Sequence, residues 1–282
     1  MKAVNSPIRD IAKYILGPLK GTSIYSYIQA WSMSRDIVNN VMTEAEIELL
    51  NYAIIKGENV IDIGANYGMY TYHMSNLVGE NGNVIAFEPI PFTFKTLTKI
   101  CKRLSLKNVT LHMLAISDKN ELASFKIPLQ AAGHLMAGQA YLGSRKDNHG
   151  DIENQVRWNK TTEIISRTIH LDGSGLIREP ISLIKLDIEG AEYFALKGAK
   201  KLIDENDPTI IMEINPWFLD GFSYSIDDLI EPLFKQGYKM YMYLKDQKIL
   251  KPITTFESVL EANYVFIHKS KLNRFKPLLR SI

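Results

Sequence analysis

The stretch that decides the fold reads Val60-Ile61-Asp62-Ile63-Gly64-Ala65-Asn66-Tyr67-Gly68. An apolar run ends in an acid, small residues follow at alternate positions, and a helix-like segment begins. This order predicts a strand, a tight turn and the start of a helix. Gly64 and Gly68 let the backbone come close to a ligand and to the next helix, and Asn66 tolerates a left-handed turn conformation. Free amide groups at the helix start would meet an anionic ligand group, and Asp62 can accept hydrogen bonds from a cation or from hydroxyls.

The composition indicates an ordinary globular protein. Of the 282 residues, 46% are hydrophobic and 23% are charged, values typical of soluble domains. The net charge of +2 gives no argument for nucleic acid, whose binding usually needs a strongly basic face. The single cysteine, Cys101, excludes a disulfide within the chain and fits a reducing compartment. No apolar run approaches the ~20 residues of a membrane span and no signal-peptide pattern follows Lys2, so we expect a cytoplasmic protein.

Further apolar runs predict the other strands of an α/β fold. They lie at residues 83–87, 109–114, 181–186, 209–212, 238–244 and 263–267. Helix-like segments separate most of them, whereas only a turn region separates the last two, which predicts an antiparallel pair. The expected architecture is a twisted, mostly parallel sheet with one antiparallel strand and helices on both faces.

The acid that follows the second strand has the sequence spacing of a ribose-binding residue. Glu88 lies twenty positions after Gly68, and in dinucleotide-binding folds an acid about 20 residues on holds ribose hydroxyls. The loop after the third strand, which contains Ala115 and Ile116, would lie beside the base of a nucleotide in a doubly wound sheet. These positions predict a cofactor that carries adenosine.

Several motifs taken in order resemble the FkbM-type methyltransferases, class I enzymes that use S-adenosylmethionine. They are Asp62-x-Gly64-x-Asn66-x-Gly68, Phe87-Glu88-Pro89, Ala115-x-x-Asp118, Lys185-Leu186-Asp187-Ile188-Glu189-Gly190-Ala191-Glu192 and Met212-Glu213-Ile214. The resemblance runs from about Val60 to Asn215. It implies a Rossmann-like α/β fold whose seven-stranded, mostly parallel sheet has its last strand antiparallel and helices on both faces.

The resemblance also implies which residues meet the methionine part of the cofactor. Gly64, Ala65 and Asn66 would approach it closely. Asp62 would fix the turn and meet the amino group, and Gly68 would complete the loop.

The adenosine part would lie over the next strands. The resemblance implies that Glu88, followed by Pro89, binds the ribose hydroxyls, and that Ala115 and Ile116 flank adenine. Asp187 would face the sulfonium and the methyl acceptor.

Many members of this family are thought to methylate sugar hydroxyls in polysaccharides, glycolipids or natural products, which implies a glycan or small-molecule acceptor. An alcohol needs a base to remove its proton during attack. In this fold Asp187 and Glu213 end neighbouring strands, which lie ~4.8 Å apart, so both can face one acceptor. Two close carboxylates raise the pKa of one of them, which retains a proton-accepting role near neutral pH. Alternatively, they could hold Mg²⁺ together with Asn215, because magnesium prefers oxygen ligands.

Two other hypotheses stay open. An NAD-dependent oxidoreductase shares the strand, the turn and the ribose-binding acid, but it expects Gly-x-Gly-x-x-Gly, which Gly64-x-Asn66-x-Gly68 does not match. A non-catalytic module could bind S-adenosylmethionine without transferring its methyl group. Binding of NAD alone would favour the first, and cofactor binding without methyl transfer would favour the second.

We expect the chain to divide around the motifs. The predicted parts are a helical extension or lid at residues 1–42, a methyltransferase domain at 43–270 with an insert at about 126–165, and a basic tail at 271–282. Residues 24–41 carry no clear secondary-structure pattern.

The flanking segments suggest further roles. Residues 8–19 are basic with apolar groups at helical spacing, which indicates a helix packed on the main domain or on a second subunit of a homodimer. A lid or a peripheral membrane contact is the alternative for this helix. The insert is predicted to roof the acceptor site, because long loops in compact domains are often functional covers. His134 is its most base-like group and the third candidate for catalysis, after Asp187 and Glu213.

Overall fold

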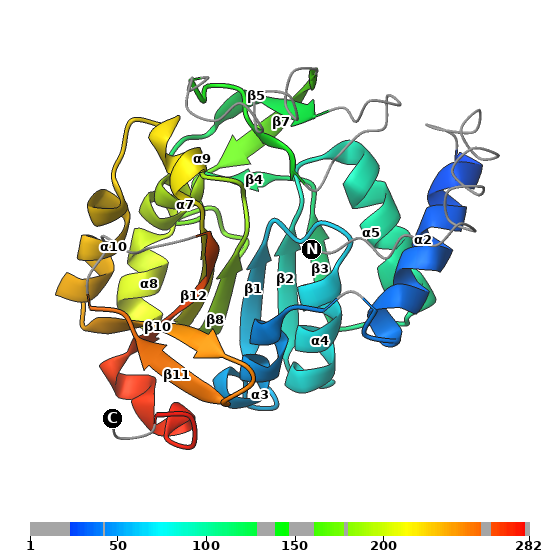
Figure 1. Cartoon of the computed structure of the whole chain (residues 1–282). Coiled ribbons are helices and arrows are strands. Elements are labelled where there is room, and N and C mark those ends of the chain that lie inside the picture. The colour runs from blue at the N-terminus through cyan, green and yellow to red at the C-terminus, as the bar shows by residue number, and fades with distance from the viewer. Residues whose placement is uncertain are drawn as a thin grey trace.

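The structure is a computed structural model that describes residues 23–41, 43–128, 139–146, 161–177, 180–254 and 261–279. In these residues the strands form one sheet of eight strands and one of four. Helices cover the larger sheet, and the smaller sheet lies across one end of it (Figure 1).

The large sheet confirms the predicted fold class. Its strands lie in the order β11-β10-β12-β9-β8-β1-β2-β3. The five strands from β9 to β3 pair in parallel, whereas β12 runs antiparallel to β9 and to β10. The last strand of the chain is therefore antiparallel, as predicted. The bounds are β1 Asn59–Ile63, β2 Asn83–Phe87, β3 Val109–His112, β8 Ile181–Leu186, β9 Thr209–Ile214, β10 Tyr238–Leu244, β11 Ile249–Pro252 and β12 Ala262–His268.

The sheet has eight strands where seven were predicted. The additional strand, β11, pairs antiparallel with β10 from Leu244↔Ile249 to Tyr241↔Pro252 and forms the edge. Its four residues end in a proline, which is confined to edge strands because it cannot donate to a ladder. So short a run carries too little alternation to be predicted as a strand.

Both faces of the large sheet are covered, which explains the nearly continuous apolar strands. Ile61 and Ile63 of β1 pack with residues of α7, α8 and α10, whereas Val60 packs on the opposite face with residues of α3, α4 and η4. The bounds are η2 Ala45–Leu49, α3 Leu50–Ala53, α4 Met69–Val78, α7 Glu192–Gly198, α8 Lys200–Asn206, α9 Pro216–Asp220, α10 Ile226–Lys235 and η4 Lys269–Phe275.

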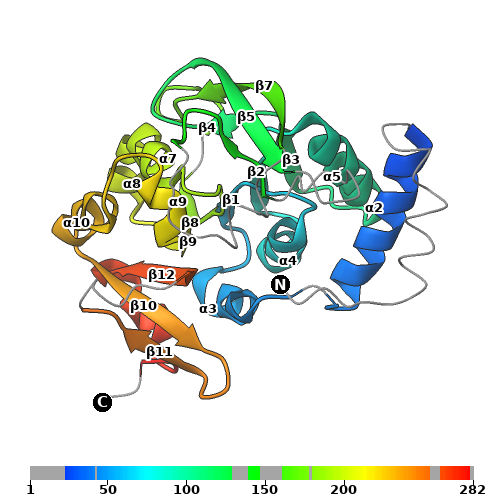
Figure 2. The same ribbon diagram turned by 45° about the horizontal axis from the view of Figure 1, so that its top comes forward.

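Helix α2 (Ser23–Val38) lies beside α5 (Pro91–Arg103) on the outside of the α4 layer (Figures 1 and 2). Ala30 and Ile37 of α2 form a buried cluster with Ile100 of α5. Cys101 is a buried free thiol in a small apolar cluster. Among the described helices, none has the length and apolar character needed to cross a membrane.

The small sheet has the order β4-β7-β5-β6. Its stem is an antiparallel pair, β5 (Glu121–Pro128) with β7 (Thr161–Ile169), and β4 (Ala115–Ile116) and β6 (Tyr141–Leu142) flank it. Figures 1 and 2 place this sheet over the carboxyl ends of β1 and β2. The described strands of this region, β5, β6 and β7, thus lie over the end of the large sheet where the cofactor motifs are.

Candidate active site

The turn after β1 approaches β8 so closely that only glycine fits at position 64. Gly64 has φ +81°, and a Cβ built on it would lie 2.0 Å from the carbonyl oxygen of Asp187. The N–H groups of Gly64 and Ala65 donate to the carbonyl oxygen of Phe87 at 3.0 and 2.9 Å. Asn66 follows with φ +49°, the left-handed conformation that its residue type tolerates. The ends of β1, β2 and β8 therefore meet at this turn.

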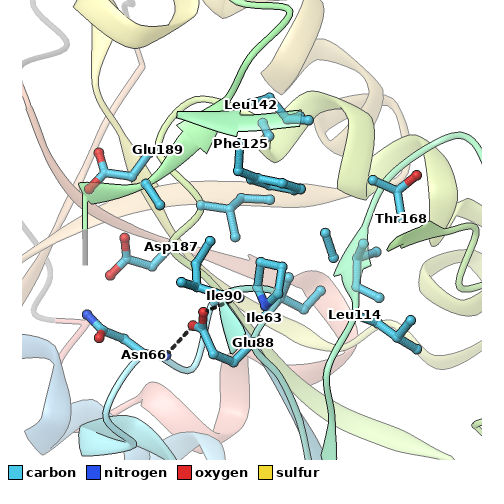
Figure 3. Close-up of a pocket in the computed structure, with 17 residues that line it drawn as sticks. Ile63, Asn66, Glu88, Ile90, Leu114, Phe125, Leu142, Thr168, Asp187 and Glu189 are labelled. Atoms are coloured by element: carbon cyan, nitrogen blue, oxygen red, sulfur yellow. Dashed lines mark hydrogen bonds between the residues drawn. The ribbon is translucent and has the colours of Figure 1, made fainter. Parts of the chain in front are cut away.

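Glu88 is buried at the end of β2, where it holds two backbone amides. Its Oε2 accepts a hydrogen bond from the N–H of Asn66 and its Oε1 accepts one from the N–H of Ile90, both at 2.9 Å (Figure 3). Burial raises the pKa of Glu88 to about 7, although these two amides oppose the shift. Each carboxyl oxygen has two lone pairs, so Glu88 can still accept hydrogen bonds from hydroxyls in the cleft that it lines.

An open cleft lies over these strand ends, with an empty volume of about 680 Å³ that includes space open to solvent. Phe125 and Leu142 of the small sheet lie on the side opposite Glu88 (Figure 3). Most of the other lining residues are apolar, so the cleft combines apolar walls with the carboxyl groups of Glu88, Asp187 and Glu189. It brings together these predicted cofactor residues: Gly64, Asn66, Glu88, Pro89, Ala115, Ile116 and Asp187.

A second cavity lies at the same turn. Met33 and Ile37 of α2 contribute to its lining, so the extension before the main domain is part of the site. It also brings together Asp62, Gly64, Ala65, Asn66 and Asp187 from the predicted set with Glu44, Tyr70 and Lys185. The two cavities share three lining residues, which are Gly64, Asn66 and Asp187.

Asp62 fixes the start of α4 to β1. Its carboxyl is buried, and Oδ2 accepts a hydrogen bond from Oγ1 of Thr71 at 2.5 Å. Burial raises the pKa of Asp62 to about 6, against the opposing effects of Thr71 and of the Lys185 charge. This contact agrees with the turn-fixing role expected of Asp62.

Lys185 is a fully buried cation that lines the second cavity, and no role was predicted for it. Its Nζ donates to the carbonyl oxygen of Leu186 at 3.1 Å and to Oδ1 of Asn263 at 3.0 Å. It lies 3.7 Å from Oδ2 of Asp187. Burial opposes the charge, but the carboxylates of Asp187 and Glu44 outweigh it and raise the pKa of Lys185. A lysine inside the apolar run of β8 was the one signal that could have identified it.

Glu44 links three separate parts of the chain to this lysine. Its Oε2 accepts hydrogen bonds from the hydroxyl of Tyr70 at 2.8 Å and from Nδ2 of Asn263 at 3.0 Å. Because Asn263 also accepts from Lys185, the segment before η2, helix α4, strand β12 and strand β8 share one polar network at the second cavity.

Three carboxyl groups converge at the ends of β8 and β9. Asp187, Glu189 and Glu213 each offer an oxygen atom, and these oxygens lie within 4.8 Å of one another. Burial, and then the negative charge of Asp187, raise the pKa of Glu213 far above its usual range and raise that of Glu189 in the same direction. The expected meeting of Asp187 with Glu213 is therefore present in the structure, and we expect Glu213 to hold a proton near neutral pH.

The remaining candidates lie away from the cavities or outside the described residues. Asn215, expected as a magnesium ligand, caps α9 by accepting a hydrogen bond from the N–H of Trp217 at 3.0 Å. Gly68 lines neither cavity; it precedes α4 with φ +85°, and a Cβ there would lie 2.6 Å from Leu97. His134 and the helix expected at residues 8–19 lie outside the described residues.

The chain is similar in sequence to known methyltransferases. The family model described as the methyltransferase FkbM domain matches residues 62–240. Methyltransferase 1 of Beauveria bassiana is 24% identical over 143 residues, which are 49% of this chain and 57% of that protein. Methyltransferase sdnD of Sordaria araneosa is 23% identical over 195 residues, which are 61% of this chain and 71% of that protein. The chain thus spans little more than half the length of the first of these relatives.

The matches among solved structures include methyltransferases, at low sequence identity and low TM-score. The crystal structure of methyltransferase FkbM from Methylobacillus flagellatus KT has a TM-score of 0.44 at 15% identity, over 75% of this chain and 43% of that one. Fibrillarin of Aeropyrum pernix, solved with S-adenosyl-L-methionine bound, has a TM-score of 0.40 at 11% identity, over 76% of this chain and 68% of that one.

Proposed function

Because this chain belongs to the FkbM methyltransferase family, we propose that it transfers a methyl group from S-adenosylmethionine to a hydroxyl of a sugar in a glycan, glycolipid or natural product. One observation carries the proposal. The turn at Gly64 brings the buried acid of β2, Glu88, and the strand-end acid of β8, Asp187, to a single cleft.

The cleft fits the adenosine part of the cofactor. Glu88 offers a carboxyl, fixed by two backbone amides, to the ribose hydroxyls. The apolar walls beside it, with Ala115, Ile116 and Phe125 among their residues, fit an aromatic base. This assignment combines one polar anchor with apolar walls, as small-molecule sites usually do.

The second cavity fits the methionine part. A methionyl group carries an ammonium and a carboxylate, and the cavity has acids, Asp62 and Glu44, together with the cation of Lys185. We assign the acids to the ammonium and Lys185 to the carboxylate. Gly64 lines both cavities, which suits a ligand that passes over it.

The bound cofactor supplies a methyl group that is already activated for transfer. The protein then has to orient an acceptor hydroxyl, take its proton and exclude water. We assign to Asp187 the role of the base that takes the proton of the acceptor hydroxyl. Asp187 lines both cavities and lies 3.7 Å from the Lys185 ammonium. Glu213, protonated because of its burial and the Asp187 charge, would hold the orientation of Asp187, and the small sheet would cover the cleft.

A divalent ion is the weaker alternative for the three carboxyl groups. Oxygen ligands of this kind suit Mg²⁺, but Lys185 already supplies a fixed positive charge at Asp187. Asn215, the third expected ligand, caps a helix instead. We therefore propose a reaction that needs no metal, and methyl transfer that stops on chelation would contradict this.

The acceptor can be found by labelling. The protein is incubated with S-adenosylmethionine labelled at its methyl group and with glycan, glycolipid and small-molecule fractions of the source cells, and label is followed into each fraction. Base-stable label in a sugar-containing fraction is the expected result, since a methyl ether survives alkaline hydrolysis. Label in no fraction, despite cofactor binding, would favour the non-catalytic module.

A further inference from the structure

Helix α2 carries apolar side chains on two opposite faces. The inner face, with Ala30, Met33 and Ile37, packs against the α5 side of the domain and the second cavity. The outer face bears apolar side chains at successive helical turns, and these are 36–64% exposed. Exposed apolar side chains that gather on one face often mark a surface that binds a partner or a membrane. The exposed set, which we call the α2 outer face, is Ile24, Tyr27, Ile28, Trp31 and Val38.

The neighbouring helix α5 is basic. Helix α5 lies next to α2 (Figures 1 and 2) and has four Lys or Arg residues and no acid. Helix α2 adds Arg35, while its one acid, Asp36, is only 9% exposed. The whole chain has 33 basic and 31 acidic residues, so its charges nearly cancel. The basic residues gathered on α5 and α2 are therefore offset by acidic residues elsewhere in the chain. The basic residues of α5 are Lys95, Lys99, Lys102 and Arg103.

Two contacts join the cations to the exposed aromatic rings. Nζ of Lys99 lies 4.0 Å from the ring centre of Tyr27, and the guanidinium of Arg35 lies 5.9 Å from that of Trp31. Tyrosine and tryptophan are enriched at the interface between lipid head groups and acyl chains, and helices that lie there carry basic residues beside their apolar face.

We propose that the α2 outer face docks on the surface of an anionic phospholipid bilayer. Its aliphatic and aromatic side chains would enter the boundary of head groups and acyl chains, and the α5 cations would meet lipid phosphates. A second copy fits poorly, because an isologous contact would bring two patches of like charge together. Nucleic acid fits the charge, but Ile24, Ile28 and Val38 have no π-face on which a base could stack.

Docking there would place the site near the lipid. The helix that bears the α2 outer face also supplies Met33 and Ile37 to the second cavity. One helix would therefore touch the bilayer on one side and line the proposed cofactor site on the other. Vesicle binding is measured without methyl transfer, so it stands or falls independently of the proposed reaction.

The test is sedimentation of the full chain with vesicles of phosphatidylcholine alone or mixed with phosphatidylglycerol. Wild type should sediment with the mixed vesicles and not with phosphatidylcholine, and added salt should weaken binding. Trp31→Glu should weaken it by about tenfold or more, because a large apolar side chain is lost from the contact. Lys95→Gln and Lys102→Gln should each weaken it by about fivefold.

Matched controls separate this face from apolar or basic residues in general. Leu122→Glu replaces a side chain on β5 that is 74% exposed, and Lys251→Gln neutralises an exposed lysine on β11. Both should bind vesicles as wild type does, and thermal unfolding of every variant checks that it folds.

Several results would overturn the proposal. The first is that wild type does not bind mixed vesicles. The second is that the control variants lose as much vesicle binding as the α2 and α5 variants. The third is that Ile11→Glu or Ile15→Glu weakens vesicle binding whereas Trp31→Glu does not. Dissociation of a dimer by Trp31→Glu without any vesicle binding would assign the face to a second copy. Binding to a single-stranded oligonucleotide in place of vesicles would assign it to nucleic acid.

Discussion

Gly64 and Asp187 approach each other through their backbones, and a Cβ at position 64 would lie 2.0 Å from the carbonyl oxygen of Asp187. This approach holds the loop after β1 against the end of β8. It also explains why the two residues line both cavities. The glycine of the first motif and the acid of the fourth are thus parts of one structural unit.

Gly64→Ala should lower stability and abolish binding of S-adenosylhomocysteine, because backbone atoms of β8 cannot move aside for the added methyl group. Gly173→Ala is the matched control, since Gly173 has φ +73° but nothing within 4 Å of its Cβ position. The control loses only the ~1 kcal/mol or so of a left-handed alanine, and thermal unfolding with calorimetric titration compares the two. Equal losses in both variants would show that the close approach has no importance.

Glu88 should make the ligand-free protein less stable as pH rises. Its pKa in the folded state is about 7 against an ordinary value of 4.5. Its contribution is therefore fully present below about pH 4.5 and is lost as pH rises through about 7, by at most about 3 kcal/mol. Urea unfolding at pH 5 and pH 8 should show that the free energy of unfolding falls less for Glu88→Gln than for wild type. An equal fall in the two proteins would contradict the assignment.

Loss of the buried cation should destabilise the carboxyl cluster. Lys185→Met removes the buried positive charge that lies 3.7 Å from Asp187, whose side chain is 36% exposed. Breaking a fully buried ion pair costs about 3–5 kcal/mol, and the loss here should be smaller because solvent screens Asp187. The loss of folding stability should be larger at high pH. Without the Lys185 charge, the neighbouring carboxyl groups are harder to ionise in the folded state than in the unfolded chain. Lys251→Met on the exposed edge strand should change little, and a Lys185→Met variant as stable as this control would argue against the network.

Asp187 and Glu213 should affect methyl transfer more than cofactor binding. With the acceptor fraction identified by labelling, Asp187→Asn should slow transfer by about 10²–10⁴-fold, the usual range for a lost general base. Glu213→Gln keeps a neutral group at position 213 and should slow methyl transfer less than Asp187→Asn does. Binding of S-adenosylhomocysteine should stay within a few-fold of wild type in both, and Glu231→Gln on the surface of α10 serves as the control. Full activity in Asp187→Asn would remove the proposed base.

The sequence predicts the sheet well because its strands are buried on both faces and end in recognisable residues. Glu88 and Asp187 could be placed at one edge from the order of the strands alone, since parallel strands point their carboxyl ends the same way. What the sequence does not show is that Glu88 also binds the amides of Asn66 and Ile90. Pairing between a side chain and distant backbone leaves no periodic pattern.

Lys185 and α2 were missed for different physical reasons. Lys185 lies in a strand whose other side chains are apolar, and its partners Asn263 and Glu44 are distant in sequence. Helix α2 has apolar residues on both faces, so the 3.6-residue alternation that identifies a surface helix is weak. His134 stays a prediction, because it lies outside the described residues.

The most direct test of the central claim is calorimetric titration of the full chain with S-adenosylmethionine and, separately, with NAD. Wild type should bind S-adenosylmethionine and not NAD, and Glu88→Ala should bind it at least about tenfold more weakly, as expected when hydrogen bonds to a carboxyl are lost. Binding of NAD alone, or unchanged affinity of Glu88→Ala for S-adenosylmethionine, would contradict the account.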